Sequence, residues 1–224
     1  MNTATIIACL AGLALAAPAG ALAVDREGSW ETTLGIVFQN SSDAEFQGGT
    51  TAEFDSDTSF VFGLDYHYTD NIAFGGRLGI GTTDYTASIA TDANGDGNAD
   101  GFANVRGDLE STTLSLNATW NFMSGPISPF VTGGIGWSWV DTNIATGPPQ
   151  TGCWWDPWWG YVCTSFQDTK TLDGFAYELG VGARWDITDT VAVHGAYRIN
   201  WIDFDKAKGT PDFDGFQLSF GWKF

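Results

Sequence analysis

The final stretch of the chain, DFDGFQLSFGWKF, constrains the fold more than any other segment. From residue 216 onward every second position is apolar, namely Phe216, Leu218, Phe220, Trp222 and Phe224. Small or polar residues stand between them, so the pattern has a period of two, which predicts a β-strand with one apolar and one polar face. A soluble domain rarely leaves such an aromatic face uncovered. The stretch therefore favours a strand whose apolar side contacts something other than water.

The same alternation recurs along the rest of the chain. It predicts eight strands over residues 30–39, 59–68, 72–81, 112–122, 131–139, 175–186, 191–201 and 216–224. Each is about ten residues long, as a tilted strand needs to cross a bilayer. Tight turns at 69–71, 124–126 and 188–190 alternate with long loops at 40–57, 90–108, 143–171 and 203–212. This predicts an all-β, eight-stranded antiparallel up-and-down transmembrane β-barrel with long extracellular loops and both termini in the periplasm.

Aromatic residues gather at the ends of the predicted strands, on the apolar face. One band, beside the tight turns, comprises Trp30, Tyr66, Tyr68, Phe74, Trp120, Phe122, Trp185, Trp222 and Phe224. A second band, beside the long loops, comprises Phe38, Phe60, Trp137, Trp139, Phe175, Tyr177, Trp201 and Phe216. Two such bands are expected where a barrel meets the two membrane interfaces.

Taken together, these features resemble the small eight-stranded outer-membrane barrels of the OmpA/OmpX and opacity-protein type. The resemblance implies one barrel domain over residues 24–224, integral to the outer membrane of a Gram-negative bacterium and in contact with its lipid and lipopolysaccharide. It also implies insertion by the barrel-assembly machinery, with Phe220, Trp222 and Phe224 as the assembly signal. The alternative is a soluble, lipocalin-like barrel, which would turn its apolar face inward. The polar face here has few lysines and many glycines, which favours the membrane barrel.

The charge balance excludes one class of partner. The 224 residues include 9 Lys and Arg against 27 Asp and Glu, a formal net charge of −18. Nucleic acid is bound by basic surfaces, so we expect no nucleic-acid partner. The mean hydropathy of −0.07 is too polar for a bundle of membrane helices, whereas barrel strands turn only alternate residues toward lipid.

Residues 1–23 form a separate unit in the sequence. An apolar run over residues 6–17 is followed by Pro18 and Gly20, and residues 21–23 have the A-x-A form of a signal-peptidase site. No Lys or Arg precedes the run, which is atypical. A weaker match to a lipoprotein motif ends at Cys9. We predict a signal peptide over 1–23 and a mature chain that begins near Val24.

The polar face of the strands carries charges of both signs. In an eight-stranded barrel this face points inward, where there is room for little besides side chains, and buried charges must pair or draw in water. We therefore expect a filled interior with a network of ion pairs among Glu31, Asp65, Arg77, Glu178, Arg184, Arg198 and Lys223. Asp186, His67 and His194 share this face. The alternative is a narrow, porin-like path for ions or small solutes.

The second long loop contains DANGDGNAD, which resembles the first part of an EF-hand calcium loop. The candidate ligands are Asp92, Asn94, Asp96, Asn98 and Asp100. Position 12 of the pattern is Ala103 where the motif has a bidentate Glu, so a flexible acidic turn is the alternative. Calcium is the one cofactor that the sequence suggests.

The third long loop contains CWWDPWWGYVC, which places four tryptophans between Cys153 and Cys163. A pair of cysteines in an exported protein predicts a disulfide. Exposed tryptophans are costly unless they contact something, so the Trp154–Tyr161 segment is a candidate site for an extracellular partner, a glycan or another membrane. Alternatively, it folds over the barrel mouth or dips into the outer leaflet.

The sequence thus predicts a surface or envelope protein with acidic extracellular loops and a structural or adhesive role. A narrow channel is the second interpretation. We find no catalytic pattern around the two histidines, His67 and His194, and expect no enzymatic activity.

Overall fold

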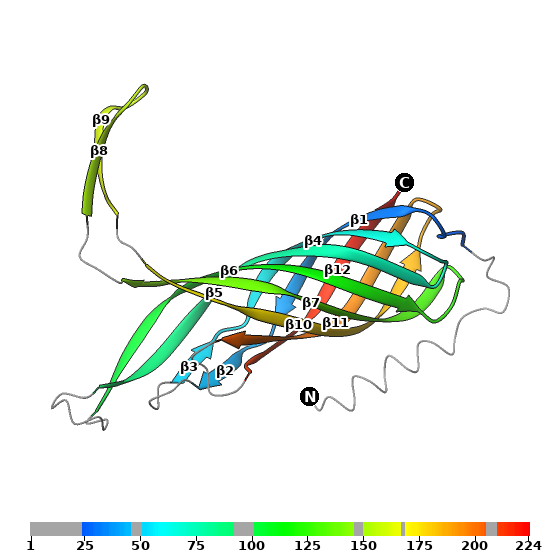
Figure 1. Ribbon diagram of the computed structural model, residues 1–224, viewed down its shortest axis with the longest axis horizontal. Helices are drawn as coiled ribbons and strands as arrows, with labels where there is room; N and C mark the ends of the chain where they lie inside the picture. Colours follow the sequence, from blue (N-terminus) through cyan, green and yellow to red (C-terminus); the bar gives the residue numbers. More distant parts are fainter. Residues whose placement is uncertain (1–23, 46–50, 92–100, 146–149, 167–168, 205–209) are drawn as a thin grey trace.

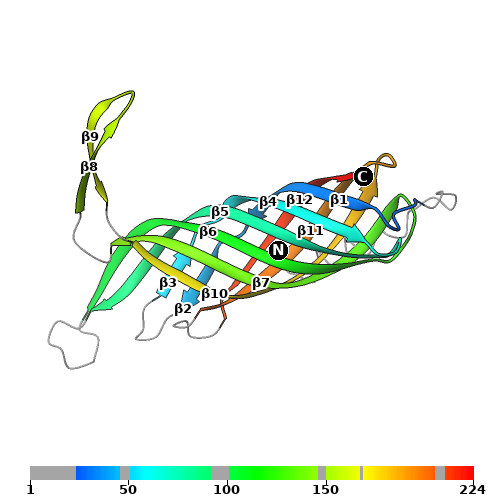
Figure 2. The same cartoon turned by 45° about the horizontal axis from the view of Figure 1, so that its top comes forward.

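The structure, a computed structural model, describes residues 24–45, 51–91, 101–145, 150–166, 169–204 and 210–224. Eight antiparallel strands close into a barrel in the order β1 (Trp30–Gln39), β4 (Asp57–His67), β5 (Ile72–Thr91), β6 (Gly101–Asn121), β7 (Ile127–Ala145), β10 (Thr169–Asp186), β11 (Val191–Phe204) and β12 (Asp212–Lys223). β12 then pairs with β1, from Glu31 opposite Lys223 to Gln39 opposite Gly215, which closes the ring. Figures 1 and 2 show the tilted strands of this barrel.

The barrel is apolar outside and polar inside. In β12, Phe220 and Trp222 are 60% and 62% exposed, whereas Ser219 and Lys223, which flank this pair in the sequence, are 1% and 3% exposed. The other barrel strands alternate in the same sense. Side chains of the two predicted aromatic bands point outward, among them Trp120, Phe122 and Trp137. This confirms the predicted fold and excludes the lipocalin-like alternative, because a soluble barrel buries its apolar face.

The two ends of the barrel differ. At one end, which we call the turn end, tight connections join β4 to β5, β6 to β7 and β10 to β11. At the other, the loop end, β5, β6 and β7 contain 20, 21 and 19 residues, and the ladder of β5 with β6 continues beyond the last pairs of β4 with β5 and of β6 with β7. These strands are about twice as long as predicted. The pairing of β5 with β6 continues from Ile72 opposite Trp120 to Thr91 opposite Gly101, so the added backbone groups are hydrogen-bonded within the ladder.

Two of the predicted long loops contain strands. Residues 40–57 include β2 (Ser42–Glu45) and β3 (Thr51–Phe54), and residues 143–171 include β8 (Gln150–Asp156) and β9 (Gly160–Phe166). The prediction of loops was wrong here because these strands have only four to seven residues each, too few for a clear alternation of apolar and polar positions. Pairing of β2 with β3 and of β8 with β9 nevertheless satisfies the backbone groups on the facing edges of these strands.

An apolar core lies on the inner face at the loop end. β3 pairs with the extension of β5, and Phe54 and Tyr85 pack there with three alanines. A second cluster on β7, β10 and β11 comprises Val140, Ala176, Ile202 and Phe204. Leu109 and Phe213 pack against both clusters, which joins them into one apolar cap over the loop end of the interior.

Among the described residues there is no helix long and apolar enough to cross a membrane.

Candidate functional site

Charged residues fill the turn end of the interior. The turn-end cluster comprises Arg26, Glu31, His67, Arg184, Asp186, His194 and Lys223, and all but His194 are at most 5% exposed. Asp186 lies at its centre: its carboxylate oxygens are 2.6 Å from Nη2 of Arg26, 2.9 Å from Nη2 of Arg184 and 3.2 Å from Nζ of Lys223. Buried charges of both signs are therefore paired here.

Arg26 closes this end from outside the strands. It precedes β1, is fully buried and donates to the backbone carbonyls of Asp70, Met123 and Gly125 as well as to Asp186. These carbonyls belong to two of the tight turns. The alternation of residues within strands does not indicate this role of Arg26, because Arg26 lies before the first strand. Its position as the one basic residue before Arg77 in an acidic chain was the available signal.

Glu31 is the second anion of the cluster. Its Oε2 lies 2.6 Å from Nη2 of Arg184 and 3.0 Å from Nε2 of His67, and its Oε1 lies 3.2 Å from Nε2 of His194. Both histidines of the chain are thus directed at one carboxylate. These four side chains come from β1, β4, β10 and β11, so the contacts join two separate pairs of neighbouring strands across the interior.

A second layer of charge crosses the middle of the barrel. Nη1 of Arg77 and Nη1 of Arg198 lie 2.6 Å and 3.0 Å from the same oxygen of Glu178, and we call these residues the central triad. β5, β10 and β11 provide them. Asp65 accepts a hydrogen bond of 3.1 Å from Asn117. All seven predicted network residues thus point into the interior, in two separate layers.

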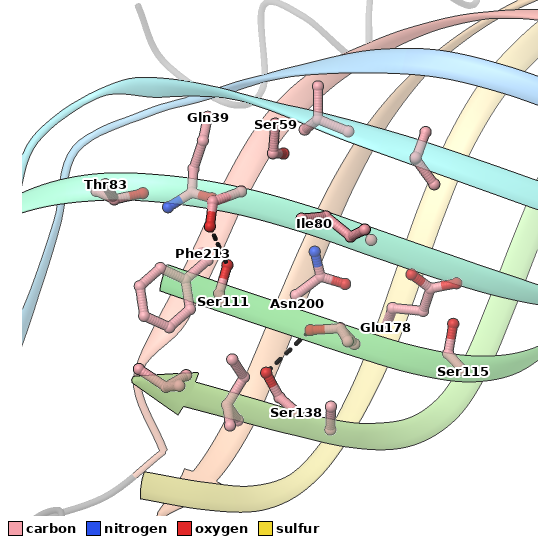
Figure 3. A pocket seen from close by; sticks show the side chains of 18 of the residues that line it. Gln39, Ser59, Ile80, Thr83, Ser111, Ser115, Ser138, Glu178, Asn200 and Phe213 are labelled. Atoms are coloured by element: carbon pink, nitrogen blue, oxygen red, sulfur yellow. Dashed lines mark hydrogen bonds between the residues drawn. The ribbon is translucent and has the colours of Figure 1, made fainter. Parts of the chain in front are cut away.

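The rest of the interior is not filled as predicted. A cavity of about 150 Å³, the loop-side cavity, lies between the central triad and the apolar cap. Its wall includes Val61, Gly79, Gly81, Ser111, Thr113, Ser138, Val140, Asn200 and Ile202. Figure 3 shows several of these side chains around the space. The prediction of a filled interior is wrong for this half of the barrel, because glycine and serine are too small to reach across it.

A smaller cavity of about 50 Å³ lies on the other side of the central triad, towards the turn-end cluster. Arg77, Arg198 and Gln217 line both cavities. The central triad is therefore the partition between two internal spaces.

The predicted tryptophan loop is a β-hairpin. β8 and β9 pair with Cys153 opposite Cys163, and a disulfide joins the two cysteines. Trp155 lies opposite Tyr161, two positions from the disulfide and on the same face. We call residues 150–166 the aromatic hairpin. In Figures 1 and 2 it stands apart from the barrel, beyond the loop end.

Its tip is held by one carboxylate. Oδ1 of Asp156 accepts backbone N–H bonds of 2.8 Å from Trp158 and 2.9 Å from Trp159. Gly160 ends the turn with φ of 77°, a left-handed conformation that favours glycine. Trp158 and Trp159 are 89% and 83% exposed at this tip.

Two carboxylates face each other on the extension of β5 and β6. Asp84 lies opposite Asp108, and both side chains are exposed. The pKa of Asp84 is raised above its usual range, because the protonated carboxyl of Asp84 donates a hydrogen bond to Asp108 and the negative charge of Asp108 disfavours ionisation. Exposed acidic residues therefore crowd one another at the loop end.

Some predicted features fall outside the described residues. These are the signal peptide over 1–23 and the candidate calcium ligands over 92–100. Within the described part of the chain, no group of three or more His, Cys, Asp or Glu side chains is arranged to hold a metal ion.

Comparison with known proteins places this barrel in a family. The model of the outer membrane protein β-barrel domain matches residues 6–224. The chain belongs to this family of outer-membrane β-barrels. It is an integral protein of the bacterial outer membrane. No curated protein matches the chain.

Solved structures of outer-membrane proteins are similar to the chain at low sequence identity. Neisserial surface protein A is 13% identical with a TM-score of 0.54, covering 88% of this chain and 100% of that protein. Ail, the attachment invasion locus protein of Yersinia pestis, is 12% identical with a TM-score of 0.45, covering 88% and 99%. The outer membrane protease OmpT from Escherichia coli is 11% identical with a TM-score of 0.48, covering 91% and 98%. Similarity at this level concerns the fold alone, so the function must be argued from the sites of this chain.

Proposed function

We propose that this protein is a surface protein of the outer membrane that binds an extracellular glycan through the aromatic hairpin. The observation that carries the proposal is the exposed pair of Trp155 and Tyr161, which lie opposite each other and are 73% and 69% exposed. Aromatic rings of this size are costly to leave in water and dominate the energetics of interfaces.

The hairpin is rigid enough to bind with little loss of entropy. The Cys153–Cys163 disulfide and the ladder of β8 and β9 hold the two strands, and Asp156 holds the tip. Side chains that are already ordered lose little freedom when they bind, which improves affinity. Such rigidity supports a binding surface more than a flexible spacer.

The chemistry of this face fits a sugar ring. Trp155 and Tyr161 offer flat apolar surfaces for the C–H face of a sugar, and Thr151 adds a hydroxyl group on the same side. Insertion into a bilayer is disfavoured, because β8 and β9 form a sheet of only two strands in the described structure. The backbone groups on the outer edges of such a sheet would be unpaired in hydrocarbon.

The proposal includes an orientation. The turn end and both termini face the periplasm, and the loop end faces the outside of the cell, as in barrels with short periplasmic turns. The apolar outer surface contacts outer-membrane lipid and lipopolysaccharide, and the barrel-assembly machinery inserts the chain. The acidic surface, with a net charge of −18, is unsuited to nucleic acid.

A glycan array probed with the folded barrel in nanodiscs tests this function. The double variant Trp155→Ala, Tyr161→Ala should lose the glycans that the unmutated chain binds. Phe102→Ala is the matched control, because Phe102 is an exposed aromatic residue of β6 outside the hairpin. If the double variant binds the same glycans as the control, the hairpin is not the binding surface.

A narrow channel is the second candidate function. It is favoured by one observation, the two cavities that meet at the central triad. We propose that the triad obstructs this path in the unmutated protein, since Glu178 holds Arg77 and Arg198 across it. In planar bilayers the unmutated barrel should show no steady conductance of porin size, and Arg198→Ala should introduce a leak. A steady porin-like conductance of the unmutated chain would instead make transport the main function.

The proposed role is not catalytic. Both histidines are directed at Glu31 within the turn-end cluster. In that position they are part of a network of buried ion pairs inside the barrel, away from the exposed hairpin.

A further inference from the structure

The loop-side cavity combines three features that point to a ligand. The first is its size, about 150 Å³. A cavity of that volume holds a molecule of roughly the size of one benzene ring. The ligand is therefore small, with one aromatic ring or a short hydrocarbon chain.

The second feature is an apolar wall. Four aliphatic side chains face the cavity from different strands, namely Val61, Val140, Ala176 and Ile202. Phe213 of β12 also lines it. Val140, Ala176 and Ile202 also belong to the apolar cap. An apolar body is thus surrounded by hydrocarbon over most of its surface, which is the usual environment of a small-molecule site.

The third feature is an excess of positive charge on the side of the cavity that the central triad forms. We call this side the floor. The charged residues that line this cavity are Arg77, Arg198 and Glu178, so their formal charges sum to one excess positive charge. Asp65 lines the smaller cavity on the other side and is absent from this lining. Asp65 offsets part of this charge from the other side of the triad. On the cavity side, a monoanion would meet two guanidinium groups and one carboxylate.

Two buried N–H groups of the floor also lack a hydrogen-bond acceptor in the described structure. These groups are Nε of Arg198 and Nε of Arg77. Arg198 is 95% buried, as its exposure of 5% shows. Buried N–H groups are costly when unpaired, so an acceptor that reaches them is favoured. A carboxylate supplies both the negative charge and the acceptor oxygens.

We propose that the loop-side cavity is a binding site for a small apolar monocarboxylate. The carboxylate lies on Arg77 and Arg198, and the apolar body lies between Val61 and Ile202 beneath the cap. This site is inside the barrel and is independent of the glycan-binding role of the aromatic hairpin.

Gly79 allows a direct test. It lies between Val61 and Thr113 on the neighbouring strands, and its inner face opens on the cavity. A Cβ atom built there meets only the backbone oxygen of Thr113, at 4.0 Å. Gly79→Leu should therefore fold and fill the cavity. The matched control is Gly76→Leu on the same strand, because a Cβ at Gly76 meets only the backbone oxygen of Ser115, at 3.8 Å, and points to the lipid side.

The experiment is isothermal titration calorimetry of the full chain in nanodiscs, with benzoate as the probe. The unmutated chain and Gly76→Leu should bind benzoate with dissociation constants within about twofold of each other, and Gly79→Leu should bind about tenfold or more weakly. Equal binding by Gly79→Leu and Gly76→Leu would show that benzoate binds elsewhere and would overturn the proposal.

Benzylammonium tests the charge of the ligand without any substitution. It has a similar size and the opposite charge, so it should bind the unmutated chain about tenfold or more weakly than benzoate. This comparison remains decisive if Gly79→Leu fails to fold. Benzylammonium binding as tight as that of benzoate, or no detectable heat with benzoate, would reject the carboxylate site.

Discussion

Arg26 and Asp186 are 160 positions apart in the chain, and Nη2 of Arg26 lies 2.6 Å from Oδ2 of Asp186. The segment before β1 is thereby fastened to the end of β10, on a far part of the ring. Arg26 also donates to turn carbonyls at Asp70, Met123 and Gly125. One side chain thus connects the N-terminal segment, two turns and the turn-end cluster.

Arg26→Ala should destabilise the barrel by about 3 to 5 kcal/mol, the usual cost of removing one partner of a buried ion pair. The urea midpoint of the folded barrel in detergent measures this change. Lys170→Ala is the control, because Lys170 is an exposed cation of β10. A shift no larger than that of Lys170→Ala would mean that Arg26 is dispensable for stability.

Phe224 should matter for assembly in cells. Its side chain lies on the lipid face, and its backbone exchanges hydrogen bonds of 3.0 Å and 2.8 Å with Trp30. Deleting Phe224, or replacing it by Ala, should lower the amount of barrel in the outer membrane, as measured by fractionation and blotting. Phe62→Ala removes an exposed phenyl ring from β4 and should have a smaller effect. Normal yields of both Phe224 variants would rule out its role as an assembly signal.

The cysteines of the aromatic hairpin should be oxidised in freshly isolated membranes. Mass spectrometry without reductant should find the protein two hydrogens lighter than its reduced form. The double variant Cys153→Ser, Cys163→Ser should bind glycans more weakly while the barrel remains folded, because the disulfide restricts only the hairpin. Two free thiols in the native membrane would contradict this prediction.

Asp84 should titrate above its ordinary pKa of 3.8, because its protonated carboxyl donates a hydrogen bond to Asp108 and Asp108 adds a negative charge. A raised pKa means that the protonated form favours the folded extension. This contribution is fully present below pH 3.8 and is lost as the pH rises through the raised pKa. An NMR titration of the Asp84 carboxyl carbon measures the shift, and Asp108→Asn should return it towards the ordinary value. The same titration curve with and without Asp108 would refute the coupling.

Calcium binding to the segment 92–100 remains a proposal from the sequence. If the motif is a specific site, Asp96→Ala should weaken calcium binding more than Asp43→Ala, which removes an exposed carboxylate of β2. Calorimetry of the folded barrel compares the two. Equal effects would leave only the diffuse attraction of an acidic surface.

Several features were predictable because they depend on neighbours in the sequence. Alternation in β12 predicted that Phe220 and Trp222 share one face and that Lys223 points to the other, as the structure has them. The prediction was wrong for weakly alternating segments, because residues 42–45 and 51–54 form strands and β5 continues to Thr91. Their pairing depends on a partner strand, here β3 on β5, which no local pattern reveals.

Of the candidate sites, one was predictable from the sequence and one was not. The hairpin disulfide was predictable, since Cys153 and Cys163 are close in sequence. The loop-side cavity was not, because it exists only where Gly79, Ser111 and Ser138 from three strands meet at one depth. Residue size was visible in the sequence, whereas depth in the barrel depends on strand register.

The sequence by itself determined which side chains enter the barrel, because a strand turns alternate residues to opposite faces and lipid requires the apolar face outside. It also determined that charges of both signs enter together. Only the tertiary structure decided which of them pair, such as Arg77 and Arg198 with Glu178. The reason is physical: pairing across a closed barrel depends on the register of every strand around the ring and on the depth that it assigns to each side chain.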